Sequence, residues 1–191
     1  MAYEVRTSVD VKDNPRFEAD QLDLLKNPVN LTSGKPITAR GLPTEVRQIS
    51  DHKYIPDILT IFGLWVVSED FRRVVESIEP GIHQYLPFKL FRKNGEAAEK
   101  QYYFLNICRQ VDAIDMELSD TYWTESPLSK EPIELLRVGG KVVLRKDHIA
   151  GLHLWRGAGG YQTRVFFSDA LMDAVLEAKL PAVVGTPVEE V

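Results

Sequence analysis

The clearest pattern of apolar and polar positions lies between residues 58 and 79. Ile58–Val67 is an apolar, β-branched run of the kind that forms a buried strand. Ser68 follows, and apolar side chains then recur at positions 71, 74, 75 and 78, which is the spacing of one helix face. Serine is a favoured N-cap residue, and the two acids after Ser68 fall where the helix dipole favours negative charge. The pattern predicts a strand that passes through a serine cap into a helix, which Pro80-Gly81 ends.

The same arrangement recurs near the C-terminus. Phe166 and Phe167 precede Ser168, an acid follows, and the apolar positions beyond it match those beyond Ser68. A second capped helix is therefore predicted over residues 169–179. Strand–serine–helix junctions are common, so coincidence is the alternative to a true repeat. We predict an α+β fold in which two similar strand–Ser–helix elements pack on an antiparallel or mixed sheet.

The remaining strands are predicted by short apolar runs between turn signals. Residues 83–91 and 101–108 flank Lys93-Asn94-Gly95 and predict a hairpin. Residues 111–118 alternate apolar and acidic side chains, which is typical of a half-exposed strand. Shorter strands are predicted over 3–9, 132–138, 141–144, 152–155 and 162–167.

The N-terminal quarter has a different character. Residues 10–50 are polar and are interrupted by four prolines and two glycines, although residues 17–25 could form a short helix. We predict an N-terminal arm or small edge subdomain over residues 1–50. The main α+β domain is then expected over residues 51–191.

Charge narrows the choice of partner. The chain has 191 residues, a formal net charge of −5 and a pI near 5.4. This balance argues against nucleic-acid binding, which draws most of its affinity from basic patches. It suits a partner with a basic face, although mild acidity is also common in proteins that have no charged partner.

Other sequence features bear on chemistry and location. The single cysteine, Cys108, excludes an intramolecular disulfide and lies in an apolar run, where we predict a buried hydrophobic residue rather than a nucleophile. The N-terminus lacks the basic and apolar segments of a signal peptide, and the longest apolar stretch is too short to span a membrane. We therefore expect a cytoplasmic protein that contacts no membrane.

Four acids form the most distinctive candidate site: Asp112, Asp115, Glu117 and Asp120. On a strand, Asp115 and Glu117 would share one face and present a negative stripe to lysine or arginine side chains of a partner. Two alternatives are open. Carboxylates at alternate positions could bind Ca²⁺ or Mg²⁺, although the glycine of a calcium loop is absent. The acids could also be the solvated face of a strand.

A second candidate contact lies beside the glycine loop 157–160. His153, Trp155 and Arg156 could form a recognition surface, because tryptophan and arginine are typical interface anchors. The alternative is that Trp155 belongs to the core. The four histidines lack the spacing of a zinc site, and no hydrolase motif is present, so we predict no metal, no cofactor and no catalytic residue.

Several of these runs together resemble one bacterial family. They are Leu64–Arg72, His83–Leu90, Tyr102–Cys108, Val111–Ser119 and Phe166–Leu171. In this order they are similar to immunity-protein family eleven of the polymorphic toxin systems, formerly a domain of unknown function. The resemblance covers about residues 60–178.

The resemblance implies an antitoxin that binds and neutralises a cognate toxin domain encoded nearby, through a stoichiometric complex and without catalysis. It supplies no catalytic residues. Two alternatives are an enzyme that reverses the toxin's modification of its target and an oligomeric scaffold protein. Fold and family alone do not decide among them.

Overall fold

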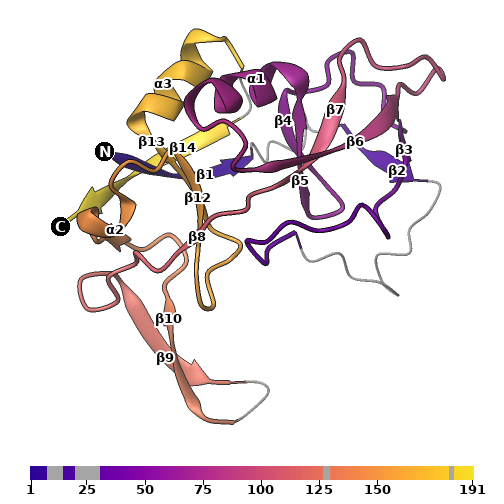
Figure 1. The fold of residues 1–191 in the computed structure, drawn as a ribbon. Coiled ribbons are helices and arrows are strands. Elements are labelled where there is room, and N and C mark those ends of the chain that lie inside the picture. Colours follow the sequence, from indigo (N-terminus) through magenta and orange to yellow (C-terminus); the bar gives the residue numbers. More distant parts are fainter. Residues whose placement is uncertain (8–14, 20–30, 127–129, 181–182) are drawn as a thin grey trace.

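The computed structural model describes residues 1–7, 15–19, 31–126, 130–180 and 183–191. The described chain is mostly sheet, with three short helices (Figure 1). One six-stranded sheet, which we call the first sheet, has the spatial order β2 (Phe17–Ala19), β3 (Glu45–Gln48), β6 (Gln84–Phe91), β7 (Tyr102–Asn106), β5 (Leu64–Ser68) and β4 (Ile58–Ile61). It is mixed, because β3 and β6 are parallel and the other neighbours are antiparallel.

The second sheet also has six strands. Their spatial order is β11 (Val143–Leu144), β14 (Val183–Glu190), β1 (Ala2–Thr7), β13 (Val165–Ser168), β12 (Leu154–Gly157) and β8 (Gln110–Val111). The two outermost pairs are parallel and the inner pairs antiparallel. A separate two-stranded ribbon consists of β9 (Thr121–Glu125) and β10 (Pro132–Leu136) and extends away from both sheets in Figure 1.

Each of the two longer helices follows a strand directly, with a serine at the junction. Ser68 ends β5 and caps α1 (Glu69–Ile78), because its Oγ accepts a hydrogen bond of 3.3 Å from the N–H of Phe71. Ser168 ends β13 and caps α3 (Asp169–Glu177) through a 3.2 Å bond from the N–H of Leu171. A third helix, α2 (Lys146–Ile149), is a single turn.

The two sheets share one hydrophobic core, which α1 and α3 cover side by side (Figure 1). Consecutive residues of a strand face opposite sides of its sheet. Val67 and Phe167 face this shared core, whereas Val66 and Phe166 face two further hydrophobic clusters on the other sides of their sheets. Phe71 of α1 stacks on Phe167 of β13 with ring centroids 6.0 Å apart. The strand–serine–helix junctions therefore place aromatic residues of both sheets in one core.

The mixed α and β composition agrees with the prediction, but the strands form two large sheets and a ribbon. The prediction of one strand over Ile58–Val67 is wrong. Phe62 and Gly63 both have positive φ, 53° and 77°, and they form a two-residue turn that splits the run into β4 and β5. Such turns match the twist of an antiparallel pair and favour glycine. The apolar run therefore forms a complete hairpin.

The predicted strand over residues 111–118 is also wrong, because β8 ends at Val111 and the chain turns around Asp115. The carboxylate of Asp115 accepts the N–H groups of Glu117 and Leu118, each at 3.1 Å. An aspartate that binds nearby backbone N–H groups favours a turn over a strand. In the predicted helix 17–25, residues 17–19 form β2, so that part of the prediction is wrong, and residues 20–25 lie outside the described chain.

The predicted hairpin around Lys93-Asn94-Gly95 is confirmed, with Gln84 opposite Asn106 and Phe88 opposite Tyr102. Within the proposed N-terminal unit 1–50, β1 lies between β13 and β14 in the second sheet, while β3 lies beside β6 in the first sheet. The first 50 residues therefore contribute strands to both sheets.

Candidate interaction surface

Two of the four predicted acids stabilise the loop to which they belong. The carboxylate of Asp115 holds the turn described above, and Asp120 accepts the N–H of Lys141 at 2.8 Å. Asp120 also makes two backbone hydrogen bonds, to Lys141 and to Arg137. These two acids therefore tie the segment 112–120 to the chain that follows β10.

The other two acids are exposed, as Asp120 is, but their carboxylates do not hold the loop. Asp112 lies at the surface with its carboxylate 3.6 Å from Arg145, and Glu117 is exposed on the turn. Because no strand forms here, Asp115 and Glu117 do not make the expected stripe on one strand face. Asp112 and Glu117 are the predicted acids that a partner could reach most directly.

The second group of predicted residues lies largely inside the molecule. Trp155 is 1% exposed and stacks on Phe166, with ring centroids 5.8 Å apart. Arg156 is 3% exposed and donates to the carbonyl of Gln162 at 2.7 Å. Burial lowers the pKa of Arg156 to about 10, which leaves its guanidinium protonated at neutral pH. Neither side chain is available as a surface anchor in this conformation.

His153, the third member of that group, is half-buried at a junction between the two sheets. Its Nδ1 lies 2.9 Å from the Oγ of the capping Ser168. Its N–H and that of Leu154 donate to the carboxylate of Glu79, at 3.1 and 2.9 Å. Glu79 ends α1 and is buried, so one carboxylate links the end of α1 to the beginning of β12.

Glu79 has further partners from the first sheet's side of the junction. It accepts hydrogen bonds from Arg109 and from His83 Nε2, the latter at 3.2 Å. Burial opposes the ionisation of Glu79, but the bonds from His83 and from the backbone of His153 outweigh it and hold the pKa of Glu79 below its ordinary value. This buried ionic junction was not predicted from the sequence, because an isolated Glu-x-x-x-His spacing at a helix end carries no specific signal.

The β9–β10 ribbon was likewise not predicted as a surface. Tyr122 is 39% exposed and Trp123 is 67% exposed, whereas Trp65 and Trp155 both contact core clusters. The signal was present in Thr121-Tyr122-Trp123-Thr124, a run of residue types that favour strands. Only the structure shows that no core covers this run.

The surplus negative charge of the chain lies in the same region. Residues 112–137 contain seven acidic and two basic residues, a net formal charge of −5, which equals that of the whole chain. The rest of the sequence is therefore balanced in formal charge. The exposed ribbon and the acidic loop before it form one continuous stretch of sequence, which we call the acidic-aromatic segment (residues 112–137).

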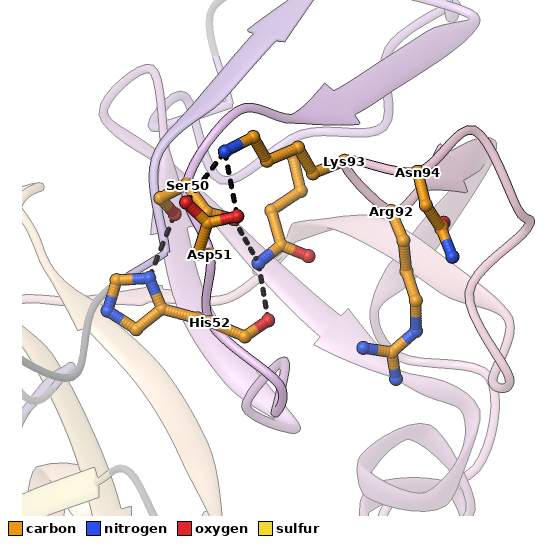
Figure 2. A pocket seen from close by; sticks show the side chains of 7 residues that line it. Ser50, Asp51, His52, Arg92, Lys93 and Asn94 are labelled. Carbon is orange, nitrogen blue, oxygen red and sulfur yellow. Dashed lines mark hydrogen bonds and ion pairs between the residues drawn. The ribbon is translucent and has the colours of Figure 1, made fainter.

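The structure also contains an open pocket of about 450 Å³ at the ends of β3 and β6, shown in Figure 2. It is lined by Gln48, Ser50, Asp51, His52, Arg92, Lys93 and Asn94. Ser50 Oγ lies 2.9 Å from His52 Nδ1, and Lys93 Nζ lies 2.6 and 2.7 Å from the two carboxylate oxygens of Asp51. A serine hydrolase triad uses Nδ1 for its acid. The pocket therefore holds the residue types of a triad without its arrangement.

Three further properties of the described part of the chain concern metal ligands, the reactivity of its cysteine and membrane-spanning helices. Among those residues, no three His, Cys, Asp or Glu side chains gather as metal ligands would. Burial raises the pKa of Cys108, which disfavours its thiolate form. None of the helices in the described ranges is long and apolar enough to cross a membrane.

The sequence matches a known protein family. A family model described as the immunity protein family Imm11 matches residues 7–189, which is nearly the whole chain. A search of curated proteins gives no match.

Proposed function

The chain belongs to the Imm11 family of immunity proteins, and we propose that it neutralises a cognate toxin by binding it in a stoichiometric complex. The family match over residues 7–189 is the observation that carries this proposal, and it confirms the resemblance seen in the ordered motifs. In this proposal the chain acts without catalysis and meets its toxin in the cytoplasm. The toxin is encoded near the gene for this chain.

The distribution of charge supports a basic partner. The acidic-aromatic segment carries the whole formal surplus of negative charge, and Asp112 and Glu117 are exposed within it. Complementary potentials speed diffusional encounter and discourage wrong partners. We place the first contact with the toxin on this segment. Asp115 and Asp120 contribute indirectly, because their hydrogen bonds hold the loop.

The arrangement of Ser50, Asp51 and His52 bears on the enzymatic alternative. An enzyme that reverses the toxin's modification would need a nucleophile or base placed against its activating group. Here Asp51 binds Lys93 instead of orienting His52. Asp51 and His52 are therefore not arranged as the acid and base of a serine hydrolase triad.

The proposal is tested by measuring stoichiometry. The chain is purified with the product of the adjacent toxin gene, and the toxin's activity is then titrated with increasing amounts of the chain. We expect a stable complex and full protection at about one equivalent. Protection at a small fraction of an equivalent would show turnover and favour an enzyme. Absence of both binding and protection would refute the proposal for that toxin.

Charge reversal locates the contact. Glu117→Lys changes an exposed acid and should weaken toxin binding, with a larger effect at low salt than at high salt. Asp115→Asn is the matched control, because it removes a neighbouring charge but keeps an oxygen that can hold the turn. Unchanged affinity in a folded Glu117→Lys protein would remove this residue from the contact surface.

A further inference from the structure

The β9–β10 ribbon stands apart from the rest of the fold. In the described part of the chain, β9 and β10 pair with each other and with no third strand. The base of the ribbon is held by Leu136, which is buried in a core cluster, and by the hydroxyl of Tyr161, which donates to the carbonyl of Glu134 at 3.4 Å. Within the described residues, neither edge of the ribbon is therefore covered by a third strand.

The ribbon presents large aromatic side chains on both of its faces. Trp123 lies opposite Glu134 in the register, and Tyr122 lies opposite Leu135. Because side chains alternate along a strand, Tyr122 and Trp123 point to opposite faces. A ribbon that enters a groove would therefore place one ring against each wall. Tryptophan and tyrosine are enriched among the residues that dominate binding energy at interfaces.

Charge identifies the partner's chemistry. Glu125 is exposed at the outer end of β9, and the half-buried Glu134, whose carboxylate accepts a hydrogen bond from Thr121 Oγ1 at 2.7 Å, lies directly across from Trp123. A groove lined by lysine and arginine would pair with these carboxylates, and arginine side chains would also stack favourably on the face of an exposed tryptophan. A second acidic ribbon would be repelled, which argues against self-association through this element.

We propose that the β9–β10 ribbon is the toxin-docking element of this protein and that it inserts into a basic groove on the toxin, with Trp123 as its main anchor. This inference rests on the toxin-binding function proposed above and specifies the surface and the kind of partner. The two sheets and their helices then act as the rigid support that presents the ribbon.

The test compares Trp123→Ala with Leu176→Ala. Trp123 and Leu176 are both 67% exposed, but Leu176 lies on α3, at the opposite end of the molecule from the ribbon (Figure 1). Each full-length variant is titrated by calorimetry against the purified product of the adjacent toxin gene, carrying a substitution that inactivates it. Loss of an interface anchor typically weakens binding about 30-fold or more.

We expect Trp123→Ala to weaken binding by about 30-fold or more, Trp123→Phe to weaken it less, and Leu176→Ala to leave it within about twofold. Glu125→Lys should slow association and flatten its salt dependence. Wild-type binding that is unchanged by Trp123→Ala would overturn the docking role of the ribbon but leave the proposed function intact. Failure of the wild-type chain to bind would refute both.

Sedimentation of the free chain tests whether a second copy of the chain, instead of the toxin, binds the ribbon. We expect no change in the chain's association state between wild type and Trp123→Ala. A wild-type dimer that Trp123→Ala dissociates, and that the toxin does not displace, would assign the ribbon to contact between copies and overturn the proposal.

Discussion

The β6–β7 hairpin and the β9–β10 ribbon are both antiparallel pairs built from aromatic and branched residues, but their surroundings differ. Every residue of β7, Tyr102–Asn106, is buried between β5 and β6, with a core cluster on each face. In β9, the residues from Tyr122 to Glu125 are exposed. Local sequence makes a strand in both cases, whereas the neighbouring elements decide whether its side chains stabilise the fold or face solvent.

This comparison predicts that two aromatic truncations lower the free energy of unfolding by very different amounts. Phe104 is buried in β7 and stacks on Phe88 with ring centroids 4.3 Å apart, so Phe104→Ala should lower the free energy of unfolding by about 3–5 kcal/mol. Trp123→Ala should change it by no more than about 0.5 kcal/mol, because the ring is exposed. Urea denaturation measures both. A destabilisation by Trp123→Ala close to that of Phe104→Ala would show that the ribbon's tryptophan also stabilises the fold.

The buried junction at Glu79 extends the comparison to charge. Glu79→Ala leaves Arg109, His83 and two backbone N–H groups without their acceptor, and it should cost about 3 kcal/mol. Exposed acids such as Glu117 should cost almost nothing to remove. Thermal or urea denaturation of the two variants is the measurement. Equal losses would show that Glu79 does not hold the two sheets together.

The same junction predicts a dependence on pH. The folded-state pKa of Glu79 is below its unfolded value of about 4.3, so its contribution is complete above that pH and is lost as the pH falls through the folded value. Wild type should therefore lose stability more steeply than Glu79→Gln does as the pH falls below about 4.3. Parallel curves for the two proteins would contradict the assignment.

The two serine caps should differ by a smaller amount. Ser168→Ala removes the cap of α3 and the contact of its Oγ with the half-buried His153 Nδ1, and should cost about 1 kcal/mol. Ser68→Ala should cost about 2 kcal/mol, because Ser68 Oγ also donates to the buried carboxylate of Asp57 at 2.6 Å. The midpoints of urea denaturation, compared at a constant dependence of the unfolding free energy on urea concentration, measure both losses of stability. A larger loss for Ser168→Ala would reverse the ranking.

Sequence patterns captured the parts of this fold that depend on local chemistry. Serine caps, helical spacing and the Asn-Gly turn have short-range causes, and the family resemblance rested on the order of such motifs. The interpretation of Ile58–Val67 as one strand failed because a buried hairpin and a buried strand share an apolar composition. The interpretation of residues 111–118 failed because the side chain of Asp115 binds the backbone and turns the chain.

The candidate surface was harder to predict, because exposure is a property of the whole fold. Trp155 and Trp123 are both tryptophans in strands, and the sequence analysis chose Trp155 for its neighbours His153 and Arg156. The structure covers Trp155 with core residues and leaves Trp123 uncovered. The acidic residues within 112–120 were identified from the sequence alone, because formal charge does not depend on the fold. The strand predicted to carry them does not form.

Amide hydrogen exchange of the chain, with and without the purified toxin, shows where the toxin binds. In the free chain, amides on the outer edges of β9 and β10, where no further strand of the described chain pairs, should exchange rapidly, while those of β7 should already be protected. We predict that toxin binding slows exchange most across Thr121–Glu125 and Pro132–Leu136 and leaves Tyr102–Asn106 unchanged. Strong new protection elsewhere, with residues 121–136 unaffected, would show that the toxin binds another face of the protein.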